Sequence, residues 1–469
     1  MKPQEILSQG DIEKIHRTSV RILENVGVEF PADSALAAFR QHGVHTDGSR
    51  VFITEDQLWD ALASAPGQFT LRARNPDRSV TIGDGGPVFA PGYGAPFLID
   101  AQGKKQVPTV EDYHDLVRLA DQLPNQDVSG HLLAEPGDVS PETAPLHMVY
   151  SHVVHSDKPF LGSVDSEQAV RHTMELVRIV FGGEAGDGPA TMGVISSLTP
   201  LGYSREMAGA IVTYAQEGQA LLVANLAMAG STAPITLVGM LAMQNAEMLA
   251  GIVLSQLVRP GTPVIYGTTS TNIDMRTGSL AIGSPELAQV GAVHMQLVRH
   301  YGLPSRGSGA LTDANFPNAQ AGLESMMGML TVVNSGVDFV LHAAGILSSY
   351  LAFSREKFVI DDEICGRVRR FHQPLVVDED TLAYDSVVNV GPGGHFLMED
   401  ETLSRCRTEF WEPQVSDRSG LDDWVDRGRP DTVARATERW KALLAAHEDP
   451  PLDSVTARQL KAFLDEETS

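Results

Sequence analysis

Two short apolar runs, Leu221-Leu-Val-Ala-Asn-Leu226 and Pro263-Val-Ile-Tyr-Gly-Thr268, predict the fold class of this chain. Between them, Thr236–Val258 has the composition of a helix. A strand, a helix and a second strand form a βα unit, and its crossover connection places the two strands parallel in one sheet. The chain is therefore predicted to be an α/β protein.

The same texture repeats along the middle of the chain, with helical stretches between the runs. Further apolar runs lie at Val128–Ala134, Pro159–Ser163, Ala190–Ser196, Ser305–Ala310 and Asp338–Ala343. Such repetition favours a closed (β/α)8 TIM barrel over an open doubly wound sheet. The eighth strand is not obvious, and Ser386–Val390 is one candidate for it; residues 109–400 are assigned to the barrel.

The two flanks differ from the middle in texture. Residues 68–99 carry short alternating runs such as Phe69–Arg74 and Val88–Ala90, separated by turn residues, which is typical of antiparallel hairpins. Together with the helices predicted before them, they make residues 1–108 an N-terminal α+β cap on the barrel. Residues 401–469 are predicted to be a C-terminal helical extension that contacts another subunit, so we expect a homo-oligomer.

Composition argues against several classes of protein. The 469 residues include 35 Lys and Arg and 60 Asp and Glu, which gives a net charge of −25. Nucleic-acid binding instead needs clustered basic side chains. Cys365 and Cys406 suit neither a disulfide framework nor a zinc pair and fit a reducing compartment. The N-terminus lacks a signal-peptide pattern, and no apolar run has the length of a membrane span. We expect a cytoplasmic protein that binds neither nucleic acid nor a membrane.

The reacting groups of a barrel lie on loops at the C-terminal ends of its strands. That rule selects Glu135, Asn225, Tyr266, Asp313, Asn315 and His342. Structural roles stay open at this point, since backbone groups could satisfy Asn225 and His342 could be a core histidine. The sequence has no HExxH pattern and no close Cys/His group, so we predict no metal site. A dinucleotide fingerprint is also missing.

Longer stretches carry a resemblance to a known family. They are Phe89-Ala-Pro-Gly-Tyr-Gly-Ala-Pro-Phe97, Asn225-Leu-Ala-Met-Ala-Gly-Ser-Thr-Ala-Pro-Ile235 with Glu247 downstream, Pro260-Gly-Thr-Pro-Val-Ile-Tyr-Gly267, Asp313-Ala-Asn-Phe-Pro-Asn-Ala-Gln-Ala-Gly322 and Gly393-Gly-His-Phe-Leu397. In this order the chain resembles, nearly end to end, the trimethylamine methyltransferase family of corrinoid-dependent methylamine and betaine methyltransferases.

The resemblance implies a TIM barrel whose mouth receives a separate corrinoid protein. No cofactor would then be bound permanently, because the partner presents the cobalamin and its Co(I) takes the N-methyl group. Some members of the family carry pyrrolysine, whereas this chain has only standard residues. We therefore expect a small quaternary amine such as glycine betaine as substrate, because it leaves as a neutral tertiary amine without protonation.

Roles in the pocket are assigned by location and chemistry. A quaternary ammonium donates no hydrogen bond, so aromatic faces are expected to bind it, at about 0.5–2 kcal/mol each. The aromatic candidates are Tyr93, Phe97, Tyr266, Phe316, Tyr350 and Phe353. Asp313 and Glu135 suit the cation. His342, Asn225 and Asn315 suit a substrate carboxylate, and Asp313 and His342 are the predicted catalytic residues.

Two other functions stay open from the sequence. The chain could be a betaine-binding or sensory barrel without turnover, or a metal-dependent TIM-barrel lyase or hydrolase. Ligand binding without methyl transfer would favour the first of these, and metal retained through purification would favour the second.

Overall fold

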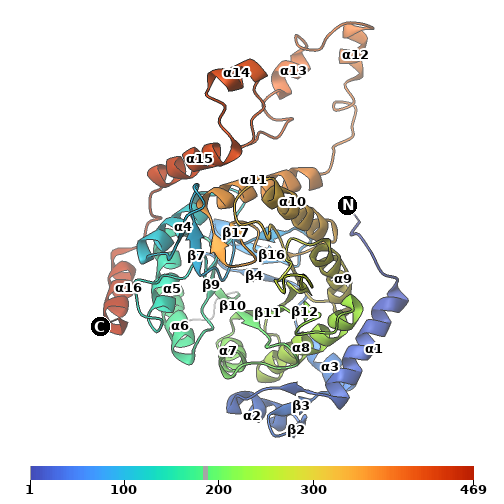
Figure 1. Ribbon diagram of the computed structural model, residues 1–469, viewed down its shortest axis with the longest axis vertical. Helices are drawn as coiled ribbons and strands as arrows, with labels where there is room; N and C mark the ends of the chain where they lie inside the picture. The colour runs from blue at the N-terminus through green and yellow to red at the C-terminus, as the bar shows by residue number, and fades with distance from the viewer. Residues whose placement is uncertain (1, 183–187, 469) are drawn as a thin grey trace.

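The computed structural model describes residues 2–182 and 188–468, and a curled sheet of parallel strands forms its centre (Figure 1). In sheet order the strands are β6 (Val88–Phe89), β16 (Phe339–Leu341), β15 (Ser305–Ser308), β13 (Val264–Thr268), β11 (Ala220–Asn225), β10 (Thr191–Ser196) and β9 (Phe160–Gly162). Each neighbouring pair is parallel. The predicted α/β class is confirmed.

The sheet does not close into the predicted eight-stranded barrel. The run Val128–Ala134 is not a strand; it lies between the two edge strands, where the N–H of Val128 donates to Phe89 at 3.3 Å and the N–H of Leu161 donates to Gly130 at 2.9 Å. Gly130 has a φ of +100°, which takes the chain out of the extended region and ends the run. The other predicted strand, Ser386–Val390, lies in helix α12 (Tyr384–Val390), far from the sheet.

Strand β6 corrects the prediction for Val88–Ala90. It pairs parallel to β16, with Phe339 opposite Val88, instead of forming an antiparallel hairpin. Both residues of β6 are buried, as expected for a strand of a parallel sheet that is covered on both faces. The hairpin prediction holds elsewhere, because β4 (Phe69–Leu71) pairs antiparallel with β5 (Val80–Ile82), and β7 (Phe97–Ile99) with β8 (Lys105–Gln106).

Helices surround the sheet (Figure 1). They are α4 (Val110–Gln122), α5 (Ala144–His155), α6 (Glu167–Phe181), α7 (Arg205–Gln216), α8 (Leu237–Val258), α9 (Pro285–Tyr301), α10 (Ala319–Asn334) and α11 (Arg355–His372). Helix α8 is long and apolar enough to cross a membrane, but 83% of its most apolar window is buried inside the protein. In this fold it is a core helix.

The N-terminal part packs on the outside of α8. It consists of α1 (Gln9–Asn25), α2 (Asp33–Gln41) and α3 (Glu55–Leu62) with a small antiparallel sheet of β1 (Val28–Glu29), β3 (Arg50–Phe52) and β2 (His45–Asp47). Helix α3 begins with a capping box, since the side chains of Thr54 and Gln57 each accept from the other's backbone N–H. Short pairs at the mouth of the sheet are β12 (Met228–Ala229) with β14 (Thr271–Asn272), and β17 (Ile346–Leu347) with β18 (Ala352–Phe353).

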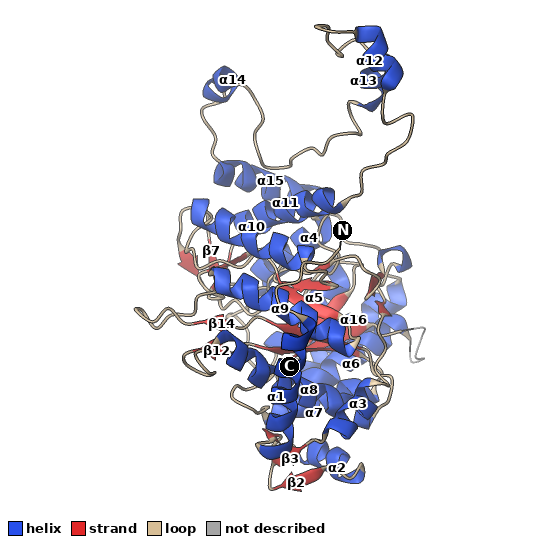
Figure 2. Ribbon diagram, turned by 90° about the vertical axis from the view of Figure 1, so that its right-hand side faces the viewer, coloured by secondary structure: helices blue, strands red, loops and turns tan. Residues whose placement is uncertain are grey.

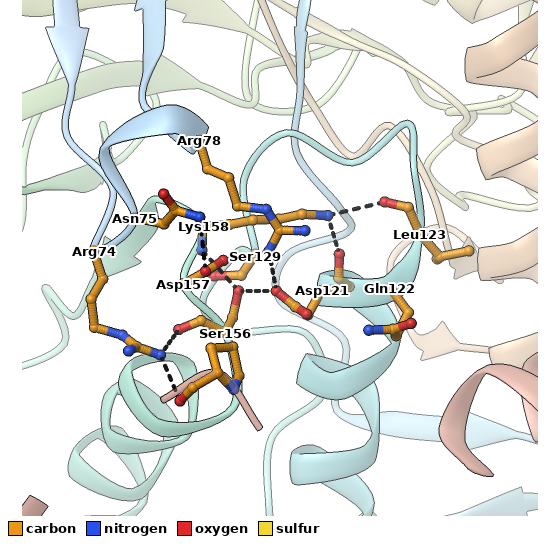
Figure 3. Close-up of polar contacts among 12 residues, drawn as sticks. Arg74, Asn75, Arg78, Asp121, Gln122, Leu123, Ser129, Ser156, Asp157 and Lys158 are labelled. Atoms are coloured by element: carbon orange, nitrogen blue, oxygen red, sulfur yellow. Dashed lines mark hydrogen bonds and ion pairs between the residues drawn. The ribbon is translucent and has the colours of Figure 1, made fainter. Parts of the chain in front are cut away.

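A polar network ties the N-terminal end of β9 to the end of α4 (Figure 3). The buried Lys158 ammonium donates to the carbonyl of Ala120 in the last turn of α4 at 2.7 Å and to that of Leu123, which follows the helix directly, at 3.0 Å. Beside it, Arg78 donates to Asp121 at 2.6 Å and also pairs with Asp157. Burial lowers the pKa of Lys158 to about 8. Because this network lies at the N-terminal edge of the sheet, it serves the fold.

The C-terminal part begins after α11 and is only partly packed on the body. Its helices are α12, α13 (Asp400–Arg405), α14 (Leu421–Asp426), α15 (Thr432–Ala446) and α16 (Ser454–Glu467). Helix α15 packs on α11 and α4, and α16 packs on α5 and α6. The segment before α15 projects away from the body (Figures 1 and 2).

Candidate functional site

A cavity of about 270 Å³ lies at the C-terminal ends of the parallel strands. It is lined by Tyr93, Gly94, Val194, Ser196, Ala224, Asn225, Leu226, Thr269, Arg306, Leu341, His342 and Tyr350. Larger hollows lie at the N-terminal side of the sheet and along the C-terminal projection, at about 400 and 830 Å³. Position selects the smaller cavity, because reacting groups of such folds are placed by the βα loops.

Arg306, which is not among the predicted site residues, provides the charge of this cavity. It comes from β15, and it is the only charged residue within the seven parallel strands. Its side chain crosses Gly267 on β13, where an added Cβ would lie 2.6 Å from both Cβ and Cδ of Arg306. The glycine therefore makes room for the guanidinium. An arginine inside a predicted barrel strand was the sequence signal that could have revealed it.

The guanidinium of Arg306 is buried without a counter-ion. The side chain is 1% exposed, and within residues 2–182 and 188–468 no carboxylate forms an ion pair with it. Nη2 donates to Nδ1 of His342 at 2.7 Å, while Nε has no partner in the described part of the chain. Burial lowers its pKa to about 10, so the group stays charged at neutral pH. A buried cation without a counter-ion is costly, so an anion in this cavity would stabilise it.

His342 is a neutral partner of Arg306. Burial and the neighbouring guanidinium hold its pKa well below the ordinary value. Since Nδ1 accepts from Arg306, Nε2 carries the hydrogen and donates to the carbonyl of Tyr93 at 3.2 Å. The backbone of His342 is left-handed, with a φ of +67°. Strained backbone of this kind gathers at functional sites.

Tyr350 lies against His342 at the end of a strained turn. The two rings meet edge to face with centroids 4.9 Å apart, and Ser348, Ser349 and Tyr350 have φ values of +53°, +52° and +76°. Asp313 holds this turn, because its carboxylate accepts from the hydroxyl of Ser349 at 2.6 Å and from two backbone N–H groups of the 282–283 segment at 2.9 Å. Asp313 thus supports the wall of the cavity and is not among its lining residues.

Asn225 reaches the cavity from β11, with its amide held by a buried carboxylate. Its Nδ2 donates to Glu247 on α8 at 2.6 Å, and its Oδ1 accepts from Ser270 at 2.7 Å. Glu247 also accepts from Ser197 at 2.8 Å and from the N–H of Leu201 at 2.8 Å. Burial raises the pKa of Glu247. The amide of Asn225 is thereby fixed in one orientation.

The structure thus brings together four of the predicted site residues: Tyr93, Asn225, His342 and Tyr350. The remaining ones lie elsewhere. Tyr266 and Phe353 are fully buried in the core, Phe97 packs under the Lys105 ammonium at 3.5 Å, Phe316 is half-buried, and Glu135 and Asn315 are exposed.

The chemistry of the cavity follows from its lining. The lining offers one guanidinium and two tyrosine rings, and it contains no Asp or Glu. Throughout residues 2–182 and 188–468, no group of three His, Cys, Asp or Glu side chains is arranged to hold a metal ion. The arrangement can hold a small molecule with an anionic end and a bulky apolar or cationic end.

Comparison with known proteins gives a consistent result. A glycine betaine methyltransferase of Desulfitobacterium hafniense is 44% identical over 98% of this chain and 96% of its own. A proline betaine:corrinoid methyltransferase of Eubacterium limosum is 32% identical, covering 98% and 97% of the two chains. The trimethylamine methyltransferase MttB2 of Methanosarcina mazei is 31% identical, covering 98% and 94%.

One solved structure supports the fold. The hydroxylamine complex of MtmB matches with a TM-score of 0.50 and 14% identity over 92% of each chain. The family model described as trimethylamine methyltransferase (MTTB) matches residues 1–469. The chain therefore belongs to the trimethylamine methyltransferase family.

Proposed function

We propose that this protein is a methyltransferase that moves an N-methyl group from a quaternary ammonium carboxylate, such as glycine betaine, to the Co(I) of a cognate corrinoid protein. The observation that carries the choice of substrate is the buried guanidinium of Arg306, which lines the cavity without a counter-ion. Two relatives are named as methyltransferases of betaines, and a betaine combines a carboxylate with a quaternary nitrogen.

The substrate carboxylate pairs with Arg306 in this proposal. A carboxylate takes two parallel N–H donors from a guanidinium, which fixes its direction as well as its position. Its charge replaces the counter-ion that the described residues do not provide. His342 keeps the guanidinium in place through the bond to its Nδ1.

The trimethylammonium group then lies toward the tyrosine rings. Tyr93 and Tyr350 line the same cavity as Arg306, and an aromatic face attracts a quaternary cation. A hydrogen-bond donor is of no use there, because the cation has nothing that accepts. This orientation leaves a methyl group pointing to the open mouth, where a partner protein can approach.

The reaction needs no acid from the cavity. The electron pair of Co(I) forms the new bond to the methyl carbon while the carbon–nitrogen bond breaks, and its electrons stay on nitrogen. The product is a neutral tertiary amine, so no proton has to move. A neutral His342 and a lining without carboxyl groups are compatible with such a step. The contribution of this chain is orientation, which can lower a barrier by several kcal/mol.

The corrinoid belongs to the partner in this proposal. A cavity of about 270 Å³ suits a small amine and is too small for a corrin macrocycle. The strong negative charge gives no basis for binding nucleic acid. Cys365 and Cys406 are free thiols, which supports a reducing compartment, and we place the reaction in the cytoplasm.

The test is a direct one. The purified protein is mixed with a corrinoid protein in the Co(I) state, and the absorbance change to methyl-Co(III) is followed with betaines, choline and trimethylamine. Conversion with a betaine and not with trimethylamine is expected. Betaine binding without conversion by any corrinoid protein of the same organism would favour a sensor, and activity that requires an added metal would favour a lyase or hydrolase.

A further inference from the structure

The strained turn that carries Tyr350 rests on a neighbouring loop. The turn, residues 348–350, joins β17 to β18, and the loop, residues 312–314, lies between β15 and α10. Two backbone N–H groups of the turn donate to carbonyls of the loop, at 2.9 and 3.2 Å. Since Tyr350 lines the cavity, the position of the 312–314 loop bears on the shape of the site.

Glu324, on α10, holds this loop from the side of the helix. Its carboxylate accepts from the hydroxyl of Thr312 at 2.5 Å and from the N–H of Asp313 at 2.9 Å. The carboxylate of Asp313 in turn accepts from the hydroxyl of Ser349 at 2.6 Å. Hydrogen bonds therefore connect Glu324, through the loop, to the turn that carries Tyr350.

A glycine provides the space for the Glu324 carboxylate. A Cβ added to Gly283 would lie 2.2 Å from both Cδ and Oε2 of Glu324. The N–H of Gly283 donates to the carboxylate of Asp313 at 2.9 Å, so these three residues are packed together. A side chain at position 283 would displace Glu324 from its hydrogen bonds. Gly283 is thus fitted to the carboxylate, as Gly267 is fitted to the guanidinium of Arg306.

We propose that Glu324 is a positioning residue that keeps the ring of Tyr350 at the cavity and thereby sets the affinity for the quaternary ammonium group. This inference rests on the proposed function. Glu324 is not one of the residues that line the cavity, so it acts through Asp313 and the turn. The turn requires such support, because left-handed backbone at residues other than glycine is unfavourable.

Calorimetric titration with glycine betaine tests the proposal in a double-mutant cycle. Glu324→Ala is expected to raise the dissociation constant by no more than Tyr350→Ala does, about 2- to 30-fold. In the Tyr350→Ala background, Glu324→Ala is expected to have no further effect, because the ring that it positions is gone. A residue that only stabilises the fold would change the affinity by the same factor in both backgrounds. Equal factors, or an unaltered affinity of Glu324→Ala, would overturn the proposal.

Three further variants separate the hydrogen bonds of Glu324 from general effects on the fold. Gly283→Ala displaces the carboxylate and is expected to weaken betaine binding as much as Glu324→Ala, so full affinity in this variant would overturn the proposal. Glu324→Gln keeps an oxygen atom for the two donors of the loop and is expected to retain the affinity. Gly322→Ala adds a methyl group to α10 where nothing lies within 4 Å, and it is the matched control with unchanged affinity. Circular dichroism checks that each variant is folded.

Hydrogen exchange of the ligand-free chain gives a measurement that does not depend on the substrate. The amides of Ser348 and Ser349 donate to the 312–314 loop, and they are expected to exchange faster in Glu324→Ala than in the unaltered protein. If the unaltered chain binds betaine and the exchange of these amides is the same in both proteins, only the present inference is wrong. If the unaltered chain binds no betaine, the proposed function is wrong and the inference falls with it.

Discussion

Removing the guanidinium of Arg306 should weaken the binding of a betaine much more than that of a ligand without a carboxylate. Arg306→Met keeps an unbranched chain in the space above Gly267 and removes the charge. A hydrogen bond to a charged group contributes about 1.5–3 kcal/mol, and about 1.36 kcal/mol corresponds to a factor of ten. The dissociation constant for glycine betaine is therefore expected to rise about 10- to 150-fold.

The assay is calorimetric titration of the variant with glycine betaine and with choline, which has the same trimethylammonium group and no carboxylate. Loss of the donor to Nδ1 of His342 disturbs both ligands alike, so the ratio of the two affinities isolates the carboxylate contact. Arg299→Met is the matched control, because Arg299 donates to the carbonyl of Ser335 at 2.6 Å, outside the cavity lining, and the ratio is expected to stay unchanged. Equal losses for the two ligands, or no loss for the betaine, would refute the reasoning.

Other parts of the site and its support can be tested separately. The ring of His131 is buried behind the cavity residue Tyr93, with the two ring centroids 6.1 Å apart. Burial lowers the pKa of His131 to about 3, so only the unfolded chain takes up a proton there as the pH falls below about 6.5. The free energy of unfolding is therefore expected to fall by about 2 kcal/mol between pH 7 and pH 5. His131→Phe is expected to remove this contribution to the pH dependence of the free energy of unfolding. Urea titrations at pH 7 and pH 5 measure that dependence. If the free energy of unfolding changes between the two pH values by as much in the variant as in the unaltered protein, the expectation is wrong. Tyr350→Ala is expected to raise the dissociation constant for a betaine, measured by calorimetry, about 2- to 30-fold. Tyr266→Phe, in the core, is expected to leave it unchanged. An effect of Tyr266→Phe without an effect of Tyr350→Ala would remove Tyr350 from the site. Glu247→Gln places an amide NH2 group among hydrogen-bond donors that now point at a carboxylate. The free energy of unfolding is expected to fall by about 1–3 kcal/mol, which thermal melts would detect. An unchanged melting temperature would mean that the carboxyl group of Glu247 is protonated.

The strands that the sequence predicts well are those with long apolar runs. β10, β11 and β13 are buried on both faces, and each reads as a nearly continuous apolar stretch, so pattern alone locates them. β6 is a two-residue strand among hairpins, and nothing local in Val88 and Phe89 specifies a partner more than two hundred positions away. Its parallel pairing is a consequence of the tertiary fold.

The candidate site was predictable where a polar residue ends an apolar strand, as at Asn225 and His342. Tyr266 does not line the cavity, because successive side chains of a strand point to opposite faces of the sheet. Gly267 lies opposite Arg306 on the cavity side of β13, so the neighbouring Tyr266 points to the helices, where its ring meets that of His294 with centroids 4.7 Å apart. Applying this alternation to β13, with Arg306 taken as facing the cavity, predicts that Gly267 faces the cavity and Tyr266 faces the helices.

The loop that carries His342 and Tyr350 shows how the site is kept ready before a substrate arrives. Left-handed backbone at such residues costs on the order of 1–3 kcal/mol each, so other contacts have to hold it. Gly345 lies between His342 and Tyr350 in the chain, and its N–H donates to the carboxylate of Asp361 on α11 at 2.9 Å. The buried ammonium of Lys357 donates to the same carboxylate at 2.5 Å. The helix behind the sheet thus stabilises the strained loop in front of it. Because both the strain and the unpaired charge of Arg306 exist in the free protein, a carboxylate that binds there gains from a site that requires little further ordering.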